Sequence, residues 1–181
     1  MKIKSLISEL RLYICNHIIN KIPSHTFRLF FYRSIMKFDI GRGSYIFLGC
    51  TFDAAKGLKI GKNSVINAKC RIDTRGGIKI GDNCSISNNV SIITADHDMN
   101  TPNMQGRTSE TIIGNNVWIG TEAMLLPSLI IGSGAVVAAR ALVTKHVYDF
   151  EVVGGVPAKH IKERKCKTNY TYSASYKRLF Q

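Results

Sequence analysis

Aliphatic and aromatic residues recur every six positions through most of the chain. The period begins at Ile40, steps by two residues after Leu58 and after Ile78, stops after Ile92 and resumes at Ile113. An α-helix, with about 3.6 residues per turn, cannot keep such a period on one face, and the tight-turn signals of antiparallel hairpins are absent. The pattern therefore predicts short strands, three to a coil, with these residues pointing inward: Ile40, Ile46, Phe52, Leu58, Ile60, Ile66, Ile72, Ile78, Ile80, Ile86, Ile92, Ile113, Ile119, Leu125, Ile131, Val137 and Val143.

Small residues mark the corners between these strands. Glycine directly follows the inward residue at six places, and a small residue stands four positions after it at ten. Such residues fit tight corners. We therefore predict a parallel β-helix over residues 39–158, with the two-residue steps as small corner bulges. The corner residues are Gly41, Gly61, Gly81, Gly114, Gly120 and Gly132, and Ser44, Cys50, Ser64, Cys70, Cys84, Val90, Val117, Ala123, Ala135 and Ala141.

The two ends of the chain lack the six-residue period. Residues 1–38 have apolar residues at helical spacing, with a break at Pro23 and an N-cap signal at Ser24. We predict two amphipathic helices that cap the open end of the β-helix, with docking of their basic face on a membrane surface as the alternative. For residues 159–181 we expect a short helix and then a tail.

The charge of the chain is concentrated at these ends. Of the net charge of +13, residues 1–38 carry +6 (seven basic, one acidic) and residues 159–181 carry another +6 (seven basic, one acidic). Basic ends favour anionic partners, but no nucleic-acid recognition motif accompanies them, and we expect no nucleic acid as partner. Charged residues interrupt any apolar run that could span a bilayer or serve as a signal peptide. We expect a cytoplasmic protein, with peripheral contact at the inner face of the membrane as the variant.

The cysteines fit the same interpretation. Cys50, Cys70 and Cys84 fall at the small inward position, so we interpret them as buried small hydrophobic residues rather than metal ligands. The count of five is odd, and no C-x-x-C pair occurs.

The last coils carry motifs of a known family. They are N-x-x-W-I-G around Trp118, I-G-x-G-A-V-V at 131–137, Val-Thr-Lys at 143–145 and V-G-G-x-P-A-K at 153–159. Over about residues 40–162 the chain resembles the hexapeptide-repeat acyltransferases, specifically the maltose/galactoside acetyltransferase-like sugar O-acetyltransferases of capsule and lipopolysaccharide type. The resemblance implies a mainly β, left-handed parallel β-helix, a homotrimer with active sites between subunits, acetyl-CoA as co-substrate and no metal.

The resemblance also implies a catalytic histidine. In that family a histidine stands in a loop that leaves one coil, and His97 has this place in a loop of about 94–112. A neutral imidazole has the right pKa to take the proton of a sugar hydroxyl during attack. On the acceptor side the candidates are Asn67, Asp73, Asn88 and Asp98, with a plain turn role left open for Asp73.

The candidates for acetyl-CoA follow from the same resemblance. Trp118 offers an apolar face. A backbone N–H at Gly120 or Thr121 is the candidate oxyanion donor. Ala139 and Thr144 match positions along the pantetheine arm. The candidate phosphate partners are Lys145, Lys159 and Lys162.

Together these features predict an acetyl-CoA-dependent O-acetyltransferase acting on a saccharide in cell-surface polysaccharide synthesis, the acceptor being free, nucleotide-linked, lipid-linked or polymeric. The first alternative is an N-acetyltransferase acting on a nucleotide-linked amino sugar. A drug-modifying transferase is disfavoured, because the loop after His97 counts as short, with at least three surplus residues. A zinc-binding β-helix used as an assembly module needs several projecting histidines, and His97 alone lies in a suitable loop, although His146 leaves that alternative open.

Overall fold

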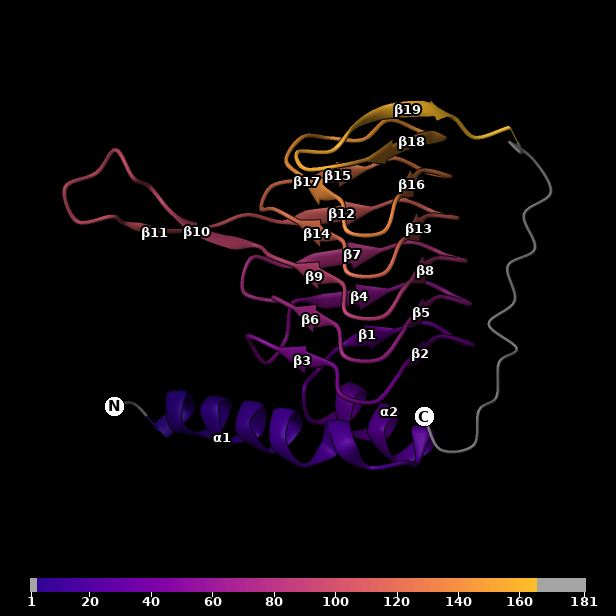
Figure 1. Ribbon diagram of the computed structural model, residues 1–181. Helices are drawn as coiled ribbons and strands as arrows, with labels where there is room; N and C mark the ends of the chain where they lie inside the picture. Colours follow the sequence, from indigo (N-terminus) through magenta and orange to yellow (C-terminus); the bar gives the residue numbers. More distant parts are fainter. Residues whose placement is uncertain (1–2, 166–181) are drawn as a thin grey trace.

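Stacked short strands form most of the molecule. The structure is a computed structural model and describes residues 3–165. Within them, three sheets run along a β-helix and are parallel except for the last strand of one sheet. Two helices cover the first coil, and a hairpin projects sideways from the middle (Figure 1). The predicted β-helix, mainly β in composition and capped by N-terminal helices, is confirmed.

Each coil contributes one strand to each sheet. The first sheet holds β1 (Asp39–Ile40), β4 (Leu58–Ile60), β7 (Ile78–Ile80), β12 (Thr111–Ile113) and β15 (Ile130–Ile131). The second holds β2 (Tyr45–Ile46), β5 (Val65–Ile66), β8 (Ser85–Ile86), β13 (Trp118–Ile119), β16 (Val136–Val137), β18 (Glu151–Gly154) and β19 (Lys159–Glu163). The third holds β3 (Thr51–Phe52), β6 (Arg71–Ile72), β9 (Ser91–Ile92), β14 (Met124–Leu125) and β17 (Leu142–Val143).

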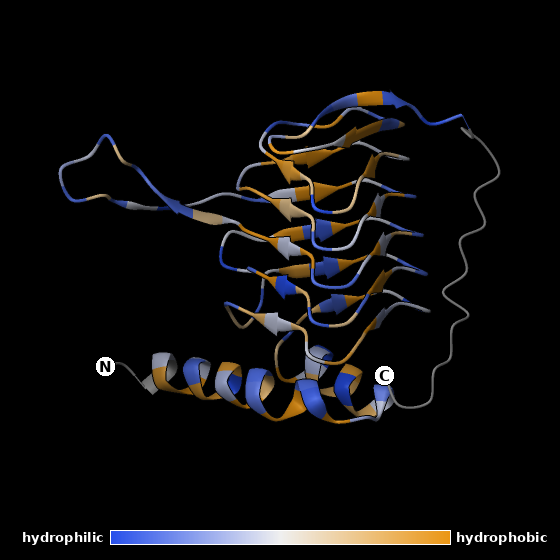
Figure 2. Ribbon diagram, viewed as in Figure 1, coloured by the Kyte–Doolittle hydropathy of each residue, from blue (hydrophilic) through white to orange (hydrophobic). Residues whose placement is uncertain are grey.

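The residues of the six-residue period fill the interior, as predicted. In the second sheet Ile66 is in register with Ile86, Ile86 with Ile119, and Ile119 with Val137. All four are fully buried. Each coil therefore stacks like on like, and the inward ends of the strands form one continuous apolar column (Figure 2).

The cysteines are small buried residues of this column, as predicted. Cys50, Cys70 and Cys84 are buried and form no disulfide. Each thiol lies close to a backbone carbonyl of the next coil; the distance from Cys70 Sγ to Ser87 O is 3.1 Å. They contribute to stacking rather than to chemistry.

The two-residue steps are not corner bulges of the kind expected. Leu58 and Ile60 lie in the same strand, with both side chains inward and Lys59 outward. Register pairs Ile40 with Ile60, so the coil is longer by two residues, and these lie in the turn before β4 rather than at the step itself. A strand of three residues can bury both of its ends, because side chains alternate between its faces.

The N-terminal helices close the apolar column. Helix α1 (Ile3–His17) leads through a short 3₁₀ helix η1 (Ile19–Lys21) to α2 (His25–Ser34), whose first turn is capped by the Ser24 hydroxyl, as predicted. Asn16 exchanges two hydrogen bonds with the backbone of Phe52, which fixes α1 on β3. No helix of the described part is long and apolar enough to cross a bilayer.

The C-terminal end differs from the prediction. Residues 159–163 form β19, which runs antiparallel to β18, where a short helix was expected. Two lysines, a histidine and a glutamate in this strand face solvent, while β18 provides a free edge whose backbone groups pair with it. Of the segment 159–181 predicted as a short helix and a tail, residues 166–181 lie outside the described residues.

Candidate functional site

A long hairpin, here called the arm, carries His97. It consists of β10 (Ala95–His97) and β11 (Gly106–Thr108), which pair antiparallel, and it extends from the side of the β-helix between β9 and β12 (Figure 1). Register places Ile92 against Leu125, an offset of 125 − 92 = 33, whereas Leu125 and Val143 are 18 apart. The arm thus adds 15 residues to a coil. The prediction of a short loop was wrong, because it compared Ile92, which lies in the third sheet, with Ile113, which lies in the first.

His97 is oriented by the backbone of the arm. Its Nδ1 lies 2.7 Å from the carbonyl oxygen of Met104. A carbonyl oxygen only accepts hydrogen bonds, so Nδ1 carries the hydrogen and the neutral ring keeps its Nε2 lone pair free. Met104 has a positive φ of 46°, and its backbone N–H is bonded to Thr101 O. A main-chain partner of this kind leaves no signal in the sequence.

The acidic neighbours of His97 shape the arm itself. Asp96 forms two hydrogen bonds with Arg107, at 2.9 and 2.8 Å, on the opposite face of β10 from His97. The Arg107 guanidinium lowers the pKa of Asp96. Asp98, predicted to bind the acceptor, accepts from the N–H of Asn100 at 3.0 Å and lies 3.6 Å from Arg107. Both carboxylates therefore stabilise the hairpin. A contact of Asp98 with the acceptor, which stays a prediction, would compete with its contacts to Asn100 and Arg107.

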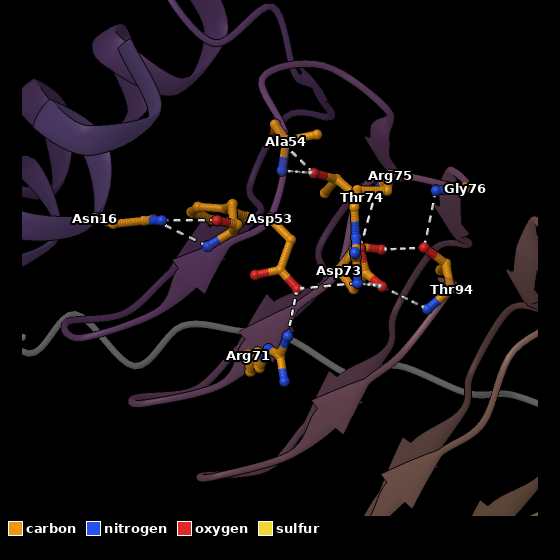
Figure 3. A network of polar contacts seen from close by, with 10 residues as sticks. Asn16, Asp53, Ala54, Arg71, Asp73, Thr74, Arg75, Gly76 and Thr94 are labelled. Carbon is orange, nitrogen blue, oxygen red and sulfur yellow. Dashed lines mark hydrogen bonds and ion pairs between the residues drawn. The ribbon is translucent and has the colours of Figure 1, made fainter. Parts of the chain in front are cut away.

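Asp73 anchors the root of the arm. It is fully buried, and its carboxylate accepts from Arg75 Nε, Nη2 and N–H and from the N–H of Thr94 (Figure 3). Thr94 directly precedes β10, and its hydroxyl donates to Asp73 O at 2.7 Å. Burial acts to raise the pKa of Asp73, but the hydrogen bonds from Arg75 and Thr94 outweigh it and lower the pKa to about 2. The predicted acceptor contact is therefore wrong, because no oxygen of this carboxylate is open to a ligand.

Three predicted residues form a column at the corner that follows the second sheet. Register makes Asn88, Thr121 and Ala139 equivalent on successive coils, and Glu122 N–H and Arg140 N–H donate to the carbonyls of Asn88 and Thr121. Within residues 3–165 the N–H groups of these three residues have no acceptor. The column thus presents open N–H donors along the axis of the β-helix.

Gly120 does not offer such a donor. Its N–H is bonded to Val137 O at 2.8 Å, so of the two predicted oxyanion donors only Thr121 remains open. Gly120 has a packing role instead, since a Cβ there would lie 2.5 Å from Ala139 N. The stacking of coils requires glycine at this position.

Trp118 lies in β13 of the second sheet, and Asn67 directly follows β5 of the same sheet. Trp118 is half exposed, and its Nε1 donates to Ser87 Oγ at 3.1 Å. Asn67 lies one coil below Ser87 and donates through Nδ2 to Ile86 O at 2.8 Å. The indole ring therefore has a fixed orientation, and the amide oxygen of Asn67 is the part of that side chain left for a ligand.

Two of the predicted phosphate partners meet at the last coil. Lys145 and Lys159 line a cavity of about 270 Å³ together with His146, His160 and Glu151. His160 Nδ1 lies 3.1 Å from Glu151 Oε1, and His146 Nδ1 accepts from Ile130 N–H at 3.0 Å. The side chains of Thr144 and Lys162 are exposed nearby on the same coil and on β19. Among residues 3–165 no group of three or more His, Cys, Asp or Glu side chains is arranged to hold a metal ion.

One chain does not bring the predicted site together. The arm with His97 leaves one side of the β-helix, and β13 with Trp118 lies on the other (Figure 1). A site that contains both side chains needs two copies of the chain.

Two sequence profiles match the β-helix. The profile described as "Bacterial transferase hexapeptide (six repeats)" matches residues 110–145, and "Hexapeptide repeat of succinyl-transferase" matches residues 57–94. This chain therefore contains hexapeptide repeats similar to those of bacterial transferases. These matches fall on the coils before and after the arm, and they confirm the resemblance inferred from the motifs.

Relatives of this hexapeptide-repeat protein are similar over part of their length. A chloramphenicol acetyltransferase from Morganella morganii is 55% identical over 58 residues, which are 32% of this chain and 28% of that relative. A putative lipopolysaccharide biosynthesis O-acetyl transferase from Escherichia coli strain K12 is 43% identical over 56 residues, or 31% and 29%. A galactoside acetyltransferase solved in complex with coenzyme A has a TM-score of 0.76 at 27% identity, over 86% of this chain and 78% of that one.

Proposed function

We propose that this hexapeptide-repeat protein transfers an acetyl group from acetyl-CoA to a hydroxyl group of a saccharide, with His97 as general base. The observation that carries the proposal is the hydrogen bond from His97 Nδ1 to Met104 O, which leaves Nε2 as an exposed proton acceptor. The acetyltransferase names of the relatives and the coenzyme A complex of the structural neighbour support the donor.

The reaction needs one base and one oxyanion donor. Nε2 of His97 takes the proton of the acceptor hydroxyl as its oxygen attacks the thioester carbonyl carbon. The negative charge then develops on the carbonyl oxygen, where the open N–H of Thr121 would donate a hydrogen bond. When the intermediate collapses, the C–S bond breaks and the imidazolium returns the proton to the CoA thiolate. The thioester is already activated, so these residues require no metal.

The donor would lie along the corner column. Thr121 and Ala139 would donate their N–H groups to amide carbonyls of the pantetheine arm, and the indole of Trp118 lies in the second sheet, which this column follows. The cavity with Lys145 and Lys159 would take a phosphate of CoA, since two lysines there outnumber the single Glu151.

A homotrimer would complete the site. Because His97 and Trp118 lie on different sides of one chain, the arm of one subunit must reach the column of its neighbour for base and donor to meet. Sedimentation equilibrium of the purified protein tests this step, and an active monomer would contradict it.

Small hydroxylated compounds are the second class of acceptor. The 55% identity over 58 residues with a chloramphenicol acetyltransferase favours them. The arm adds 15 residues to a coil, so the short loop that disfavoured drug-modifying transferases is not present. Nucleotide-linked amino sugars are the third class, for which nitrogen would be the nucleophile. Assays with free sugars, nucleotide-linked amino sugars, isolated cell-surface polysaccharide and chloramphenicol distinguish these classes by the acceptor that is turned over fastest.

The role of His97 has a direct test. We expect His97→Ala to lower kcat about 10²–10⁴-fold, because a positioned base contributes that much, and to leave the Kd of CoA unchanged in calorimetry. His17→Ala, on the exposed end of α1, is the matched control and retains full activity. Turnover of His97→Ala close to that of the unaltered protein would overturn the assignment.

A further inference from the structure

The N-terminal helices expose apolar side chains on the surface turned away from the β-helix. On α1, Cys15 and Leu12 pack inward. Leu6, Leu10 and Tyr13, spaced i, i+4 and i+7, lie on the opposite side of the helix and face solvent. On α2, Arg28 and Tyr32 are buried and Phe31 packs against the core, whereas Phe27 and Phe30 are exposed. Six large side chains are between 47% and 61% exposed and form what we call the cap face: Leu6, Ile7, Leu10, Tyr13, Phe27 and Phe30.

Large apolar side chains exposed on one side of two helices indicate an interaction site. The two helices lie across the end of the β-helix, and Figure 2 shows hydrophobic residues along both. The face is therefore at an end of the molecule, and nothing in the described fold covers it.

The charge around the cap face selects its partner. Residues 1–38 carry +6, with Glu9 as the single acidic residue. Lys21 and Lys37 are exposed at the ends of η1 and α2, and neither forms an ion pair within the described part of the chain. A second copy of the cap would bring +6 against +6, and residues 166–181, with three basic and no acidic residues, would also be repelled.

We propose that the cap face docks on an anionic phospholipid bilayer, with α1 and α2 parallel to the surface and the β-helix axis upright. Apolar side chains on one side and cations at the rim are the two features by which amphipathic helices bind such surfaces. The proposal does not depend on the acetyl-transfer reaction or on the acceptor.

The test is co-sedimentation of the full chain with vesicles. We expect binding to vesicles of phosphatidylcholine with phosphatidylglycerol, weaker binding at high salt and weaker binding to phosphatidylcholine alone. The double variant Leu10→Asp with Phe30→Asp should lower the partition coefficient at least tenfold, since two large apolar side chains no longer enter the bilayer and two negative charges face its anionic lipids. Lys21→Gln should lower it about fivefold, which corresponds to about 1 kcal/mol per lysine.

The control variant introduces the same two negative charges at the opposite end of the β-helix. Tyr148→Asp with Val156→Asp alters two exposed residues of the last coil and should bind vesicles like the unaltered protein. Circular dichroism checks that all variants fold. Binding that is equal in the cap variant and the control would overturn the proposal and point to another basic segment. Cap-dependent self-association without vesicle binding would also overturn it, in favour of a second copy.

Discussion

Removing the charge of Asp73 tests whether this residue supports the arm rather than the acceptor. Its carboxylate is fully buried and accepts four hydrogen bonds, one of them from the buried N–H of Thr94. In Asp73→Asn the remaining oxygen can keep Thr94, but the new NH₂ group then faces the donors of Arg75. A pKa lowered to about 2 against an ordinary value of about 3.9 corresponds to roughly 2–3 kcal/mol. We expect that loss for Asp73→Asn and about 3 kcal/mol for Asp73→Ala, which also leaves Thr94 N–H unpaired.

Urea denaturation at neutral pH measures this difference, and a loss of about 2 kcal/mol lowers Tm by about 4–8 °C in a chain of this size. The pH dependence of the free energy of unfolding tests the direction of this effect. Because folding lowers the pKa of Asp73, its contribution is complete above about pH 4 and is lost as the pH falls toward 2. The unaltered protein and Asp73→Asn should therefore converge in acid.

The same variant should lower kcat and leave the KM for acetyl-CoA unchanged, since Thr94 joins the anchored turn to β10. Asp39→Asn is the control, because Asp39 pairs with Lys59 at an exposed site and such pairs contribute less than about 1 kcal/mol. A stability loss at neutral pH no larger than that of Asp39→Asn would refute the anchoring role.

Three further substitutions test the stacking, the cap and the donor site. Gly120→Ala should lower stability by at least about 2 kcal/mol, because its Cβ would lie 2.5 Å from Ala139 N and coils cannot move apart without losing hydrogen bonds; thermal unfolding measures it, and an unchanged Tm would contradict the packing role. Ser24→Ala removes the cap of α2 and should cost about 1 kcal/mol in urea denaturation, whereas Thr26→Ala in the same helix serves as reference. Lys145→Gln should raise the KM for acetyl-CoA several-fold at low salt and little at high salt, and a salt-independent effect would argue against a phosphate contact.

The six-residue period predicted the β-helix because it records the one constraint that every coil shares. An inward residue such as Ile86 must match the residues above and below it, and only a stacking register explains a buried aliphatic side chain at each sixth place. The same logic predicted the buried cysteines. Helix capping at Ser24 was predicted because it depends on neighbouring residues alone.

The arm and the site were harder to derive from the sequence. Residues outside the stacking register obey no period, so the extra residues before β4 and the length of the arm could not be counted from apolar positions. Asp73 was misassigned because its four donors come partly from backbone N–H groups, which every sequence contains. The orientation of His97 depends on a carbonyl group for the same reason.

The stack of coils also acts as a spacer of fixed height. The arm leaves from the third strand of its sheet, counted from the cap, after β3 and β6. With about 4.8 Å per coil and about 10 Å for the helices, His97 would stand roughly 20 Å above a surface on which the cap rests. An acceptor attached to that surface would have to hold its reacting hydroxyl at this height, so the number of coils beneath the arm would set which sugar along a growing chain is modified.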